Sequence, residues 1–346
     1  MKAQIDRVQL FKAYLNELFG DEGVCIATSM SKDSLLSFRI NYLKVKTAQE
    51  RLTLLHNVIA QGFDFEPYFL EKNGVQVVTI EESVNEVYAF YVLSKREGQG
   101  GLILSKTKEF LEHEIYIQNP SSMLSVFELS PKAETSILDV CAAPGSKTTM
   151  IASVTENKAN VFAVEKFKPR FFSLKANLED NGVDIKRLFL SDSIGLDKKY
   201  PEYINFFDSV LVDAPCTNES RFNLSDRKSL EFWNPKKYKD LSRVQKGVLI
   251  TGARMLKPGG TLVYSTCTYN PMENEAVVDW LLSKVPEIEI CELALKLEGA
   301  SQRSVSMLEP FKTYKQYCFD SRVEKTARIM PNGTFEGFFI AKFTKK

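Results

Sequence analysis

The stretch "SILDVCAAPGSKTTMIASV", Ser136 to Val154, decides the expected fold. It begins as a short apolar strand (136–143), passes through small residues into a Pro-Gly turn, and continues as a helix. "NVFAVE" (160–165) follows as a second strand and "KPRFFSLKANLEDNGV" (168–183) as a second helix. Strands that alternate with helices predict an α/β fold with a doubly wound, mostly parallel sheet.

Three further strands are expected in this half of the chain, at 186–192, 207–215 and 259–266, with a helix at 237–256 between the last two. Ligands of such sheets bind beyond the carboxyl ends of the strands. Six chemically capable side chains fall at those ends, and we expect them to converge on one edge: Asp139, Glu165, Asp192, Asp213, Cys216 and Cys267.

The first part of the chain has a different pattern, which predicts a smaller α+β domain over residues 1–125. It precedes a catalytic domain over 126–346. No internal repeat or low-complexity linker separates them. The expected elements are a helix at about 5–19, a strand at 35–44, a helix at 47–61, strand-like segments at 74–80 and 84–93, and a segment at 111–129 that leads into the second domain.

Composition limits the class of protein. The chain has 346 residues, of which 44% are hydrophobic and 26% charged, as in a folded globular protein. No apolar run approaches the roughly 18 residues of a membrane span. Six cysteines lie without metal-site spacing and only two histidines are present, so we expect no metal site and a reducing, cytoplasmic setting.

Basic residues gather in one segment although the net charge of the chain is only +1. From Arg221 to Lys257 there are ten Lys and Arg against three Asp and Glu. A solvated helix face would explain such a run equally well. Four aromatic residues are interleaved with the charges (Phe222, Phe232, Trp233 and Tyr238), and this mixture suits a surface that holds phosphates and stacks bases.

The turn "LDVCAAPGSKT" (138–148) has features of a ligand site. Its small residues let the backbone approach a ligand, and the following helix offers free N–H groups. Its spacing is neither that of a P-loop nor G-x-G-x-x-G. Glu165 ends the next strand, where a carboxylate can accept hydrogen bonds from a ribose diol. The alternative is that the turn serves only to connect the strand to the helix and that Glu165 has a purely structural role.

Cys216 and Cys267 follow two of the expected strands. A thiolate of lowered pKa is a strong nucleophile that can attack an electron-poor ring carbon. A single cysteine is more often a small buried hydrophobe, which is our interpretation of Cys25, Cys291 and Cys318. Two cysteines at neighbouring strand ends beside a nucleoside-like pocket instead favour a catalytic role.

In its motifs the sequence resembles the Sun-type RNA (cytosine-5)-methyltransferases, which use S-adenosylmethionine. The matching stretches span roughly residues 38–343 and occur in the family's order: "FRINYLK", "IYIQNPSSML", "LDVCAAPGSKT", "VLVDAPC", "LSRVQKGVLITGARMLKPGGTLVYSTCTYNPMENEAVV" and "RIMPNGTFEGFFIAKF". The resemblance implies a Rossmann-like catalytic domain and an RNA substrate.

The resemblance also implies roles for the thiols. Cys267 matches the nucleophile that adds to C6 of cytosine, and Cys216 matches the cysteine that helps to release the methylated RNA. Asp213 matches the acid that hydrogen-bonds the ring edge of the cytosine. The target base must be unpaired or flipped out to be reached.

For S-adenosylmethionine the resemblance implies a second set of residues. Glu165 matches the ribose-binding acid, Asp192 an acid near the adenine, and Lys147 and Arg170 basic positions close to the cofactor and the active site. The turn is expected to contact the cofactor through Cys141, Ala142, Ala143, Pro144 and Gly145, and Asp213 to lie beside it. Gln118 is expected to border the base pocket, and His113 is assigned no role.

Two departures from the family pattern bear on the substrate. The stretch after Cys216 is "TNESRF", where many relatives carry glycine, and the organellar ribosomal-RNA branch is similarly poor in glycine. The chain also leaves no room for the extra C-terminal RNA-binding domain of some relatives. We therefore expect residues 1–125, which are not basic, or a protein partner, to position the RNA.

Three alternatives stay open beside ribosomal RNA methylation. Transfer RNA is the second candidate substrate, because the core motifs do not separate the two. DNA cytosine-5 methylation uses the cysteine of a "PC" motif as nucleophile and has little use for a second one in "TC", which argues against it. A non-catalytic RNA-binding assembly factor with this fold is disfavoured because Cys267 and Glu165 are both present.

Overall fold

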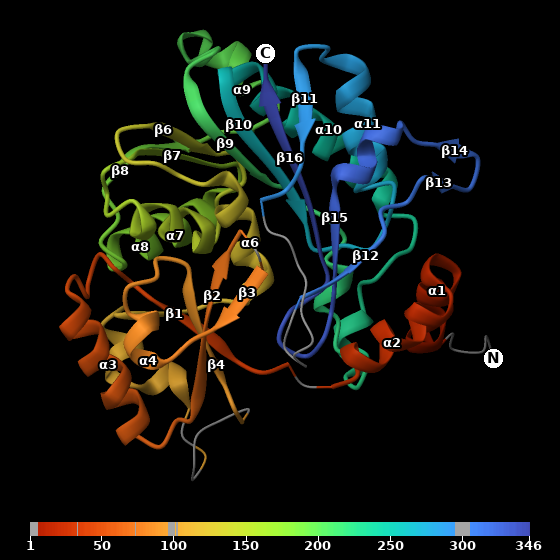
Figure 1. Cartoon of the computed structure of the whole chain (residues 1–346). Coiled ribbons are helices and arrows are strands. Elements are labelled where there is room, and N and C mark those ends of the chain that lie inside the picture. The colour runs from red at the N-terminus through yellow and green to blue at the C-terminus, as the bar shows by residue number, and fades with distance from the viewer. Residues whose placement is uncertain (1–5, 33, 73, 96–100, 102, 295–304) are drawn as a thin grey trace.

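The expected parallel strands lie side by side in one part of the larger sheet and reach one of its edges (Figure 1). The computed structural model describes residues 6–32, 34–72, 74–95, 101, 103–294 and 305–346. Five neighbouring strands run parallel, in the order β8-β7-β6-β9-β10. They are β6 (Ser136–Asp139), β7 (Asn160–Glu165), β8 (Ile185–Leu190), β9 (Phe207–Asp213) and β10 (Leu256–Thr266). The predicted fold class is confirmed.

Antiparallel strands extend this sheet beyond β10, so that it has nine strands among the described residues. The strand β16 lies between β10 and β15, β12 forms the edge beyond β15, and β11 also pairs with β16. The strands are β11 (Ile288–Cys291), β12 (Ser306–Leu308), β15 (Ala327–Met330) and β16 (Phe338–Lys345), with a separate hairpin of β13 (Thr313–Tyr314) and β14 (Tyr317–Cys318).

Helices cover both faces of the larger sheet (Figure 1). They are α6 (Pro120–Leu129), α7 (Ser146–Val154), α8 (Lys168–Asp180), α9 (Leu196–Lys199), α10 (Tyr238–Met255) and α11 (Glu275–Lys284), and short 3₁₀ turns lie at η3 (Pro201–Tyr203), η4 (Glu219–Arg221), η5 (Arg227–Leu230) and η6 (Ser321–Lys325). Pro120 starts α6 because its missing N–H is not needed there, and Asn119 caps the free N–H of Ser121.

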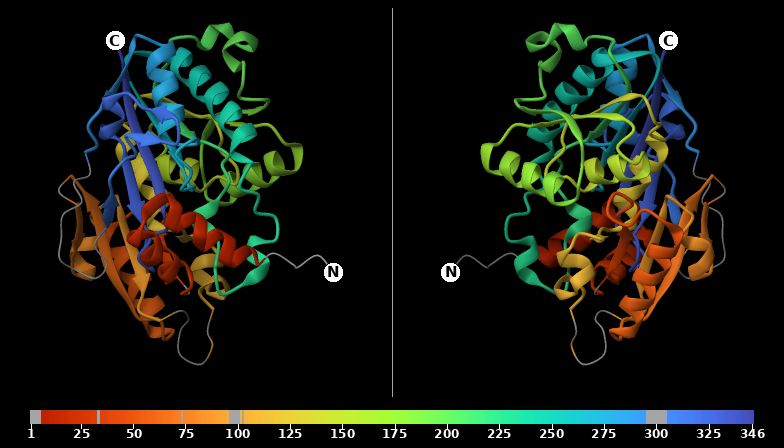
Figure 2. Two further views of the ribbon diagram at one scale, coloured as in Figure 1. Left: turned by 90° about the vertical axis from the view of Figure 1, so that its right-hand side faces the viewer. Right: turned by 90° about the vertical axis from the view of Figure 1, so that its left-hand side faces the viewer.

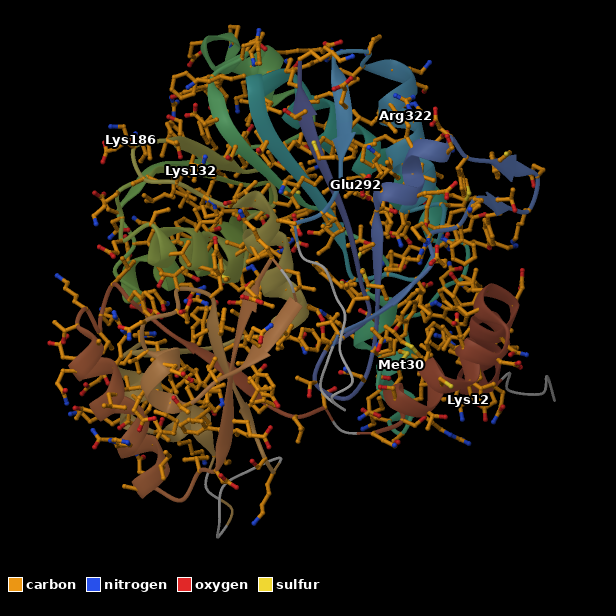
Figure 3. All side chains as sticks on the ribbon, viewed as in Figure 1. Lys12, Met30, Lys132, Lys186, Glu292 and Arg322 are labelled. Atoms are coloured by element: carbon orange, nitrogen blue, oxygen red, sulfur yellow. The ribbon has the colours of Figure 1, made fainter. Side chains whose placement is uncertain are left out.

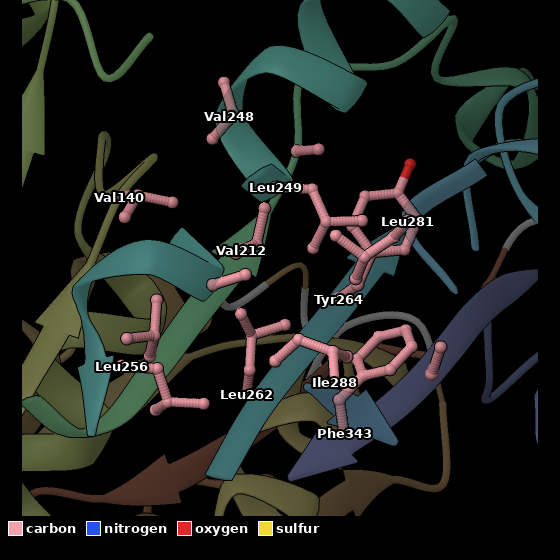
Figure 4. Packing of buried hydrophobic residues seen from close by; sticks show 14 of the residues in the cluster. Val140, Val212, Val248, Leu249, Leu256, Leu262, Tyr264, Leu281, Ile288 and Phe343 are labelled. Atoms are coloured by element: carbon pink, nitrogen blue, oxygen red, sulfur yellow. The ribbon is translucent and has the colours of Figure 1, made fainter. Parts of the chain in front are cut away.

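The main core lies between the strands and helices α10 and α11, and part of it is shown in Figure 4. Leu249, Leu262 and Phe343 are fully buried in it. Each such side chain contributes about 1.5–3 kcal/mol by leaving water. This packing fixes the carboxyl ends of β9 and β10 relative to each other, and both strands lead directly into the site described below.

The smaller sheet is built from strands between residues 37 and 117, with the order β3-β2-β4-β1-β5 and antiparallel pairing between all neighbours. Its elements are β1 (Ser37–Ile40), α3 (Ala48–Ala60), β2 (Phe65–Glu71), β3 (Gly74–Val77), α4 (Ile80–Ser83), β4 (Ala89–Leu93), η2 (Leu104–Lys106), α5 (Lys108–Leu111) and β5 (Ile115–Ile117). The helix α3 begins where Thr47 and Glu50 form a capping box.

Several expected elements of the first 130 residues differ in extent. The strand expected at 35–44 covers only 37–40, and the segment expected as a strand at 74–80 ends at Val77, before α4. The sequence analysis did not identify β2, in which Pro67 interrupts the strand pattern, or a second helix after residue 20. The expected boundary at 125/126 falls inside α6, whose residues are all buried.

The first two helices, α1 (Arg7–Phe19) and α2 (Asp21–Met30), pack against the C-terminal half of the chain, where α1 contacts η5 (Figure 2). In Figure 1 they lie apart from the smaller sheet. Phe11 meets the ring of Trp233 edge-on at a centroid distance of 4.9 Å. Met30, labelled in Figure 3, accepts a backbone hydrogen bond from Leu224 N at 2.9 Å. The N-terminal region therefore contributes to two places, the smaller sheet and this helical hairpin.

Among the described residues, no helix combines the length and the apolar character needed to cross a membrane.

Candidate active site

The turn after β6 is held by the buried carboxylate of Asp139. Its Oδ1 accepts a hydrogen bond from Cys141 N at 3.2 Å, and its Oδ2 accepts one from Thr148 Oγ1 at 2.7 Å. Burial raises the pKa of Asp139 to about 6. The carboxylate thus ties the start of the turn to the first turn of α7 and fixes the backbone that lines the site.

Gly145 has a different role from the other residues of the turn. Its φ of +112° lies in a region that side-chain-bearing residues rarely adopt. A Cβ here would also lie 2.9 Å from Asn177 Nδ2 and 3.0 Å from Leu174 Cδ1 on α8. Glycine is therefore required for the close approach of the turn to α8, and Gly145 does not line the pocket.

A pocket of about 560 Å³ opens beyond the carboxyl ends of the parallel strands. Apart from Gly145 and Gln118, all residues predicted for the site line it: Cys141, Ala142, Ala143, Pro144, Lys147, Glu165, Arg170, Asp192, Asp213, Cys216 and Cys267. Asp139 lines it too, so the six strand-end side chains do meet at one edge.

At one end of the pocket Glu165 is held by its own loop. Its Oε1 accepts a hydrogen bond from Phe167 N at 2.7 Å. Arg170 lies 3.6 Å from the other carboxylate oxygen and donates to Ala143 O at 2.7 Å. Arg170 thereby braces Glu165 and the turn against each other.

Next to Glu165, Asp192 pairs with Lys166 at 2.7 Å and accepts a hydrogen bond from Ile194 N at 3.0 Å. Phe167 and Ile194 line the same end and are exposed. Two carboxylates, exposed apolar side chains and a turn of small residues fit a nucleoside, which needs partners for a ribose diol and a flat apolar slot for a base. The residues present therefore fit S-adenosylmethionine.

The middle of the pocket holds an ion pair. Lys147 Nζ lies 2.7 Å from Asp213 Oδ2, and Ser265 Oγ donates to Asp213 Oδ1 at 2.8 Å. Lys147 is buried, whereas the Asp213 side chain is 30% exposed. The carboxylate is thus held at the boundary between the nucleoside end and the thiol end of the pocket.

Cys216 and Cys267 form the other end. Their Sγ atoms are 3.3 Å apart, and both thiols are free and buried. The hydrogen bond to Cys267, together with burial, raises the pKa of Cys216 well above its ordinary value. Arg221 lines the pocket nearby, and the charge of Cys267 raises the pKa of its guanidinium. The Cys216 thiol therefore stays protonated to a higher pH than an ordinary cysteine.

Buried acids lie beneath the two cysteine loops. Glu273 accepts hydrogen bonds from Thr217 N at 3.0 Å, Thr217 Oγ1 at 2.7 Å and Gln245 Nε2 at 3.0 Å. Glu219 accepts from Thr268 Oγ1 at 3.0 Å and from Tyr269 N at 3.2 Å. Burial and the charge of Glu273 raise the pKa of Glu219 to about 7. These bonds connect the loop after β9 to the loop after β10.

The helical hairpin also reaches this framework. Tyr14 OH on α1 donates to Glu219 Oε2 at 3.3 Å, and Trp233 Nε1 donates to Glu219 Oε1 at 3.3 Å. Trp233 is buried and Phe222 packs edge-on against Phe11, so the prediction that these two aromatic residues stack bases is wrong. Of the four, Phe232 remains strongly exposed, at 85%.

Residues of the smaller sheet form hydrogen bonds that hold the turn and α7 in place. Arg39 donates from Nε to Gln118 Oε1 at 2.8 Å and from Nη2 to Thr149 Oγ1 on α7 at 2.9 Å. Gln118 is buried in this contact and is not among the residues that line the pocket, so its predicted place beside the base is wrong. Asn177 joins Tyr116 OH to Pro144 O, at 3.0 and 2.7 Å.

Three further findings concern the sequence predictions. Cys25 and Cys318 are exposed and Cys291 is half-buried, so their interpretation as buried hydrophobes is wrong for the first two. In the parts of the chain that the structure describes, no group of three or more His, Cys, Asp or Glu side chains is arranged to hold a metal ion. Asn218 and Arg221 line the pocket but were not predicted as site residues, because only the folded loops bring them to the thiols.

The basic segment is partly neutralised by ion pairs. Lys257 pairs with Asp208 at 2.8 Å and Arg254 with Asp197 at 3.2 Å. Arg221 lies 3.6 Å from Glu336. The charge that the sequence concentrates between 221 and 257 is therefore less available to a partner than its count suggests.

A parallel sheet in this order, with a nucleoside-like pocket at its carboxyl edge, defines the class of Rossmann-like methyltransferases. Residues 126–344 match the family described as "16S rRNA methyltransferase RsmB/F", and the chain belongs to this family. The resemblance seen in the sequence is confirmed.

Relatives of known activity or structure agree with this assignment. The chain is 34% identical to the tRNA (cytosine(49)-C(5))-methyltransferase of Pyrococcus abyssi over 88% of this chain and 87% of that protein. It is 34% identical to the ribosomal RNA small subunit methyltransferase F of Klebsiella pneumoniae over 89% of this chain, but spans only 60% of that protein. A methyltransferase homolog protein from Pyrococcus horikoshii superposes with a TM-score of 0.73 at 29% identity, covering 98% of this chain and 97% of that one.

Proposed function

We propose that the protein is an S-adenosylmethionine-dependent RNA (cytosine-5)-methyltransferase. The observation that carries the proposal is the pair of thiols 3.3 Å apart at the ends of two neighbouring strands, in the same pocket as a nucleoside-binding end. Methyl transfer to an oxygen or nitrogen needs no thiol. Transfer to C5 of cytosine uses one thiol to activate the ring and a second group to restore it.

The cofactor end is formed by residues of the turn and of the next two strand ends. Glu165 would accept hydrogen bonds from the ribose hydroxyls, Asp192 would hold the adenine side, and Phe167 and Ile194 would offer the base an apolar surface. Arg170 keeps Glu165 and the turn in position. When bound, S-adenosylmethionine supplies an electrophilic methyl group.

At the thiol end Cys267 is the nucleophile. Its thiolate adds to C6 of the cytosine, a C6–S bond forms, and the electron pair of the C5–C6 double bond moves to C5, which becomes able to accept a methyl group. Asp213 accepts a hydrogen bond from the exocyclic amine of the cytosine, the pairing that carboxylates make with this base. Its contacts with Lys147 and Ser265 hold the carboxylate in position for that purpose.

Cys216 completes the reaction. It holds its proton while Cys267 is a thiolate, because the hydrogen bond between the two sulfurs favours the protonated form of Cys216. Once Cys267 is bonded to C6, Cys216 can lose its proton to solvent. After methylation the Cys216 thiolate takes the proton from C5, the electron pair of the C5–H bond re-forms the C5–C6 double bond, and the C6–S bond breaks so that Cys267 departs as a thiolate. Free thiols are needed in both roles, so we propose a reducing, cytoplasmic location.

For the substrate we propose a cytosine in ribosomal RNA, unpaired or flipped out of its helix so that the base can enter the pocket. The description of the family and the name of the Klebsiella relative support ribosomal RNA. Transfer RNA is the second candidate, supported by the Pyrococcus abyssi enzyme, of which this chain spans 87%. We also propose a protein partner that helps to bind the RNA, and a role for residues 1–125 in positioning it.

The test is methyl transfer from labelled S-adenosylmethionine to unmodified ribosomal subunits, naked ribosomal RNA and total transfer RNA. We expect label on C5 of cytosine in one RNA class, and a covalent RNA adduct that accumulates with Cys216→Ala. Cofactor binding without label on any RNA would contradict the proposal and favour a non-catalytic assembly factor.

A further inference from the structure

The loop after Cys216 places one polar side chain against both sulfurs. Asn218 Oδ1 lies 3.0 Å from Cys267 Sγ and 3.6 Å from Cys216 Sγ, and accepts a hydrogen bond from each. The backbone of Asn218 is left-handed, with φ +55°. Apart from glycine, asparagine is among the few residues that adopt this conformation readily. The residue type thus satisfies the turn and brings an amide to the thiols.

The position of this amide is fixed by the loop that carries it. Ser220 donates from N and from Oγ to Cys267 O, at 3.2 and 3.0 Å. Glu219 binds Thr268 Oγ1 and Tyr269 N, the two residues that follow the nucleophile. Cys267 and the two residues that follow it are therefore bonded to this loop, which holds Asn218 beside the sulfur.

The amide can serve both protonation states of a thiol. Its oxygen accepts a hydrogen bond from a thiol, and its NH₂ group donates one to a thiolate after a half-turn of the side chain. Asn218 is exposed toward the pocket, so that rotation breaks no packing. A hydrogen bond to a charged group is stronger than one to a neutral group.

We propose that Asn218 is a third catalytic residue, whose amide accepts from the Cys267 thiol at rest and donates to the Cys267 thiolate when it reacts. This inference rests on the proposed role of Cys267 as nucleophile. The other titratable groups around the two sulfurs on the loops that carry them are Cys216, Asp213, Arg221, Glu219, Tyr269 and Glu273. Asn218 adds to these groups a polar side chain that does not titrate.

Thiol reactivity tests the inference without RNA. The rate of Cys267 alkylation by iodoacetamide is measured between pH 6 and 9 in the full chain, with site-resolved mass spectrometry. Asn218→Gly keeps the left-handed backbone but removes the amide. Asn218→Asp keeps the shape and the acceptor but cannot donate. We expect both to slow alkylation at pH 7 by about tenfold and to shift the profile upward by about one pH unit.

Asn205 provides the matched control, because it also has a left-handed backbone, with φ +52°, and its Oδ1 accepts from Lys345 Nζ at 2.8 Å, away from the pocket residues. Asn205→Gly and Asn205→Asp should leave the alkylation profile unchanged. Cofactor affinity is measured on every variant to establish that the pocket is intact.

Two outcomes would overturn the inference. If Asn218→Gly reacts like the wild type, the amide has no role. If only Asn218→Gly is slow and Asn218→Asp is not, an acceptor is sufficient and donation to the thiolate is wrong. Failure of the proposed function would appear separately, as normal thiol profiles without methyl transfer to any RNA.

Discussion

The nucleoside end and the thiol end of the pocket are built in different ways. The nucleoside end is formed mainly by the turn after β6 and by the end of β7. Asp139 and Glu165 each bind a backbone N–H two residues further along the chain, and Arg170 binds a backbone carbonyl of the turn. The thiol end joins two loops 51 residues apart, which are held together by buried Glu219 and Glu273. A local motif forms the first end, and a tertiary framework forms the second.

This difference has energetic consequences. A strand-end turn positions its groups through hydrogen bonds with free backbone groups where the strand ends and the helix begins. Two separate loops must instead be held against each other by side chains, and buried carboxylates do so at the cost of desolvation. The raised pKa values of Glu219 and Glu273 are the sign of that cost. Substitutions at the nucleoside end should therefore change cofactor affinity, and substitutions at the thiol end should change turnover or stability.

The largest effect is expected at the nucleophile. Cys267→Ala removes the atom that bonds to C6, so turnover should fall by at least about 10³-fold. Binding of S-adenosylmethionine, measured by calorimetry, should change little because the thiol lies at the opposite end of the pocket. Turnover within tenfold of the wild type would exclude Cys267 as the nucleophile.

The next effect concerns stability and pH at the thiol end. The pKa of Glu219 is about 7 in the folded protein against an ordinary 4.5, so the folded state binds a proton that the unfolded state releases in that window. Stability therefore falls as pH rises from about 4.5 to 7, by on the order of 2 to 4 kcal/mol. Glu219→Gln removes this dependence.

The measurement is the melting temperature of Glu219→Gln relative to the wild type at pH 5, 6, 7 and 8. The variant should gain relative stability as pH rises. Glu179→Gln, at an exposed position on α8, serves as the control and should show no trend. A difference that is constant with pH would mean that Glu219 is ionised throughout.

A smaller effect is expected at the nucleoside end. Glu165→Ala removes the carboxylate that accepts from the ribose, so the Kd for S-adenosylmethionine should rise by about 10- to 100-fold. At saturating cofactor, kcat should be retained within a few-fold, because the thiols are untouched. Glu179→Ala is the matched control on the neighbouring helix. A loss confined to kcat would assign Glu165 to the wrong end of the pocket.

The smallest effect tests the smaller sheet. In Arg39→Lys the charge is kept, but lysine cannot bond Gln118 and Thr149 at the same time. The first turn of α7 therefore loses one of its hydrogen bonds to the smaller sheet. We expect a rise of about threefold in the Kd for the cofactor and no change in kcat at saturation. Arg51→Lys, in the same sheet region but bonded to Val84 O and Lys46 O, should change neither. Equal effects of the two variants would indicate a general loss of stability.

The central sheet was predictable from the sequence because its strands and helices carry clear periodicity. The predicted segment 160–165 coincides with β7, and the predicted helix at 237–256 matches α10 within a residue at each end. The first 130 residues were less predictable. Pro67 interrupts the strand pattern of β2, so the sequence did not indicate this strand. The contact of α1 with Trp233 joins residues more than 200 positions apart, which no local pattern predicts.

The sequence by itself determined the parallel sheet, the strand-end residues and the family, because periodicity and short motifs are local properties of the chain. Only the tertiary structure decided which of these residues meet. It placed the two sulfurs 3.3 Å apart, paired Lys147 with Asp213, turned Gln118 away from the pocket and brought Asn218 to both thiols. The physical reason is that hydrogen bonds between distant loops depend on positions set by the core, and no local pattern encodes those positions.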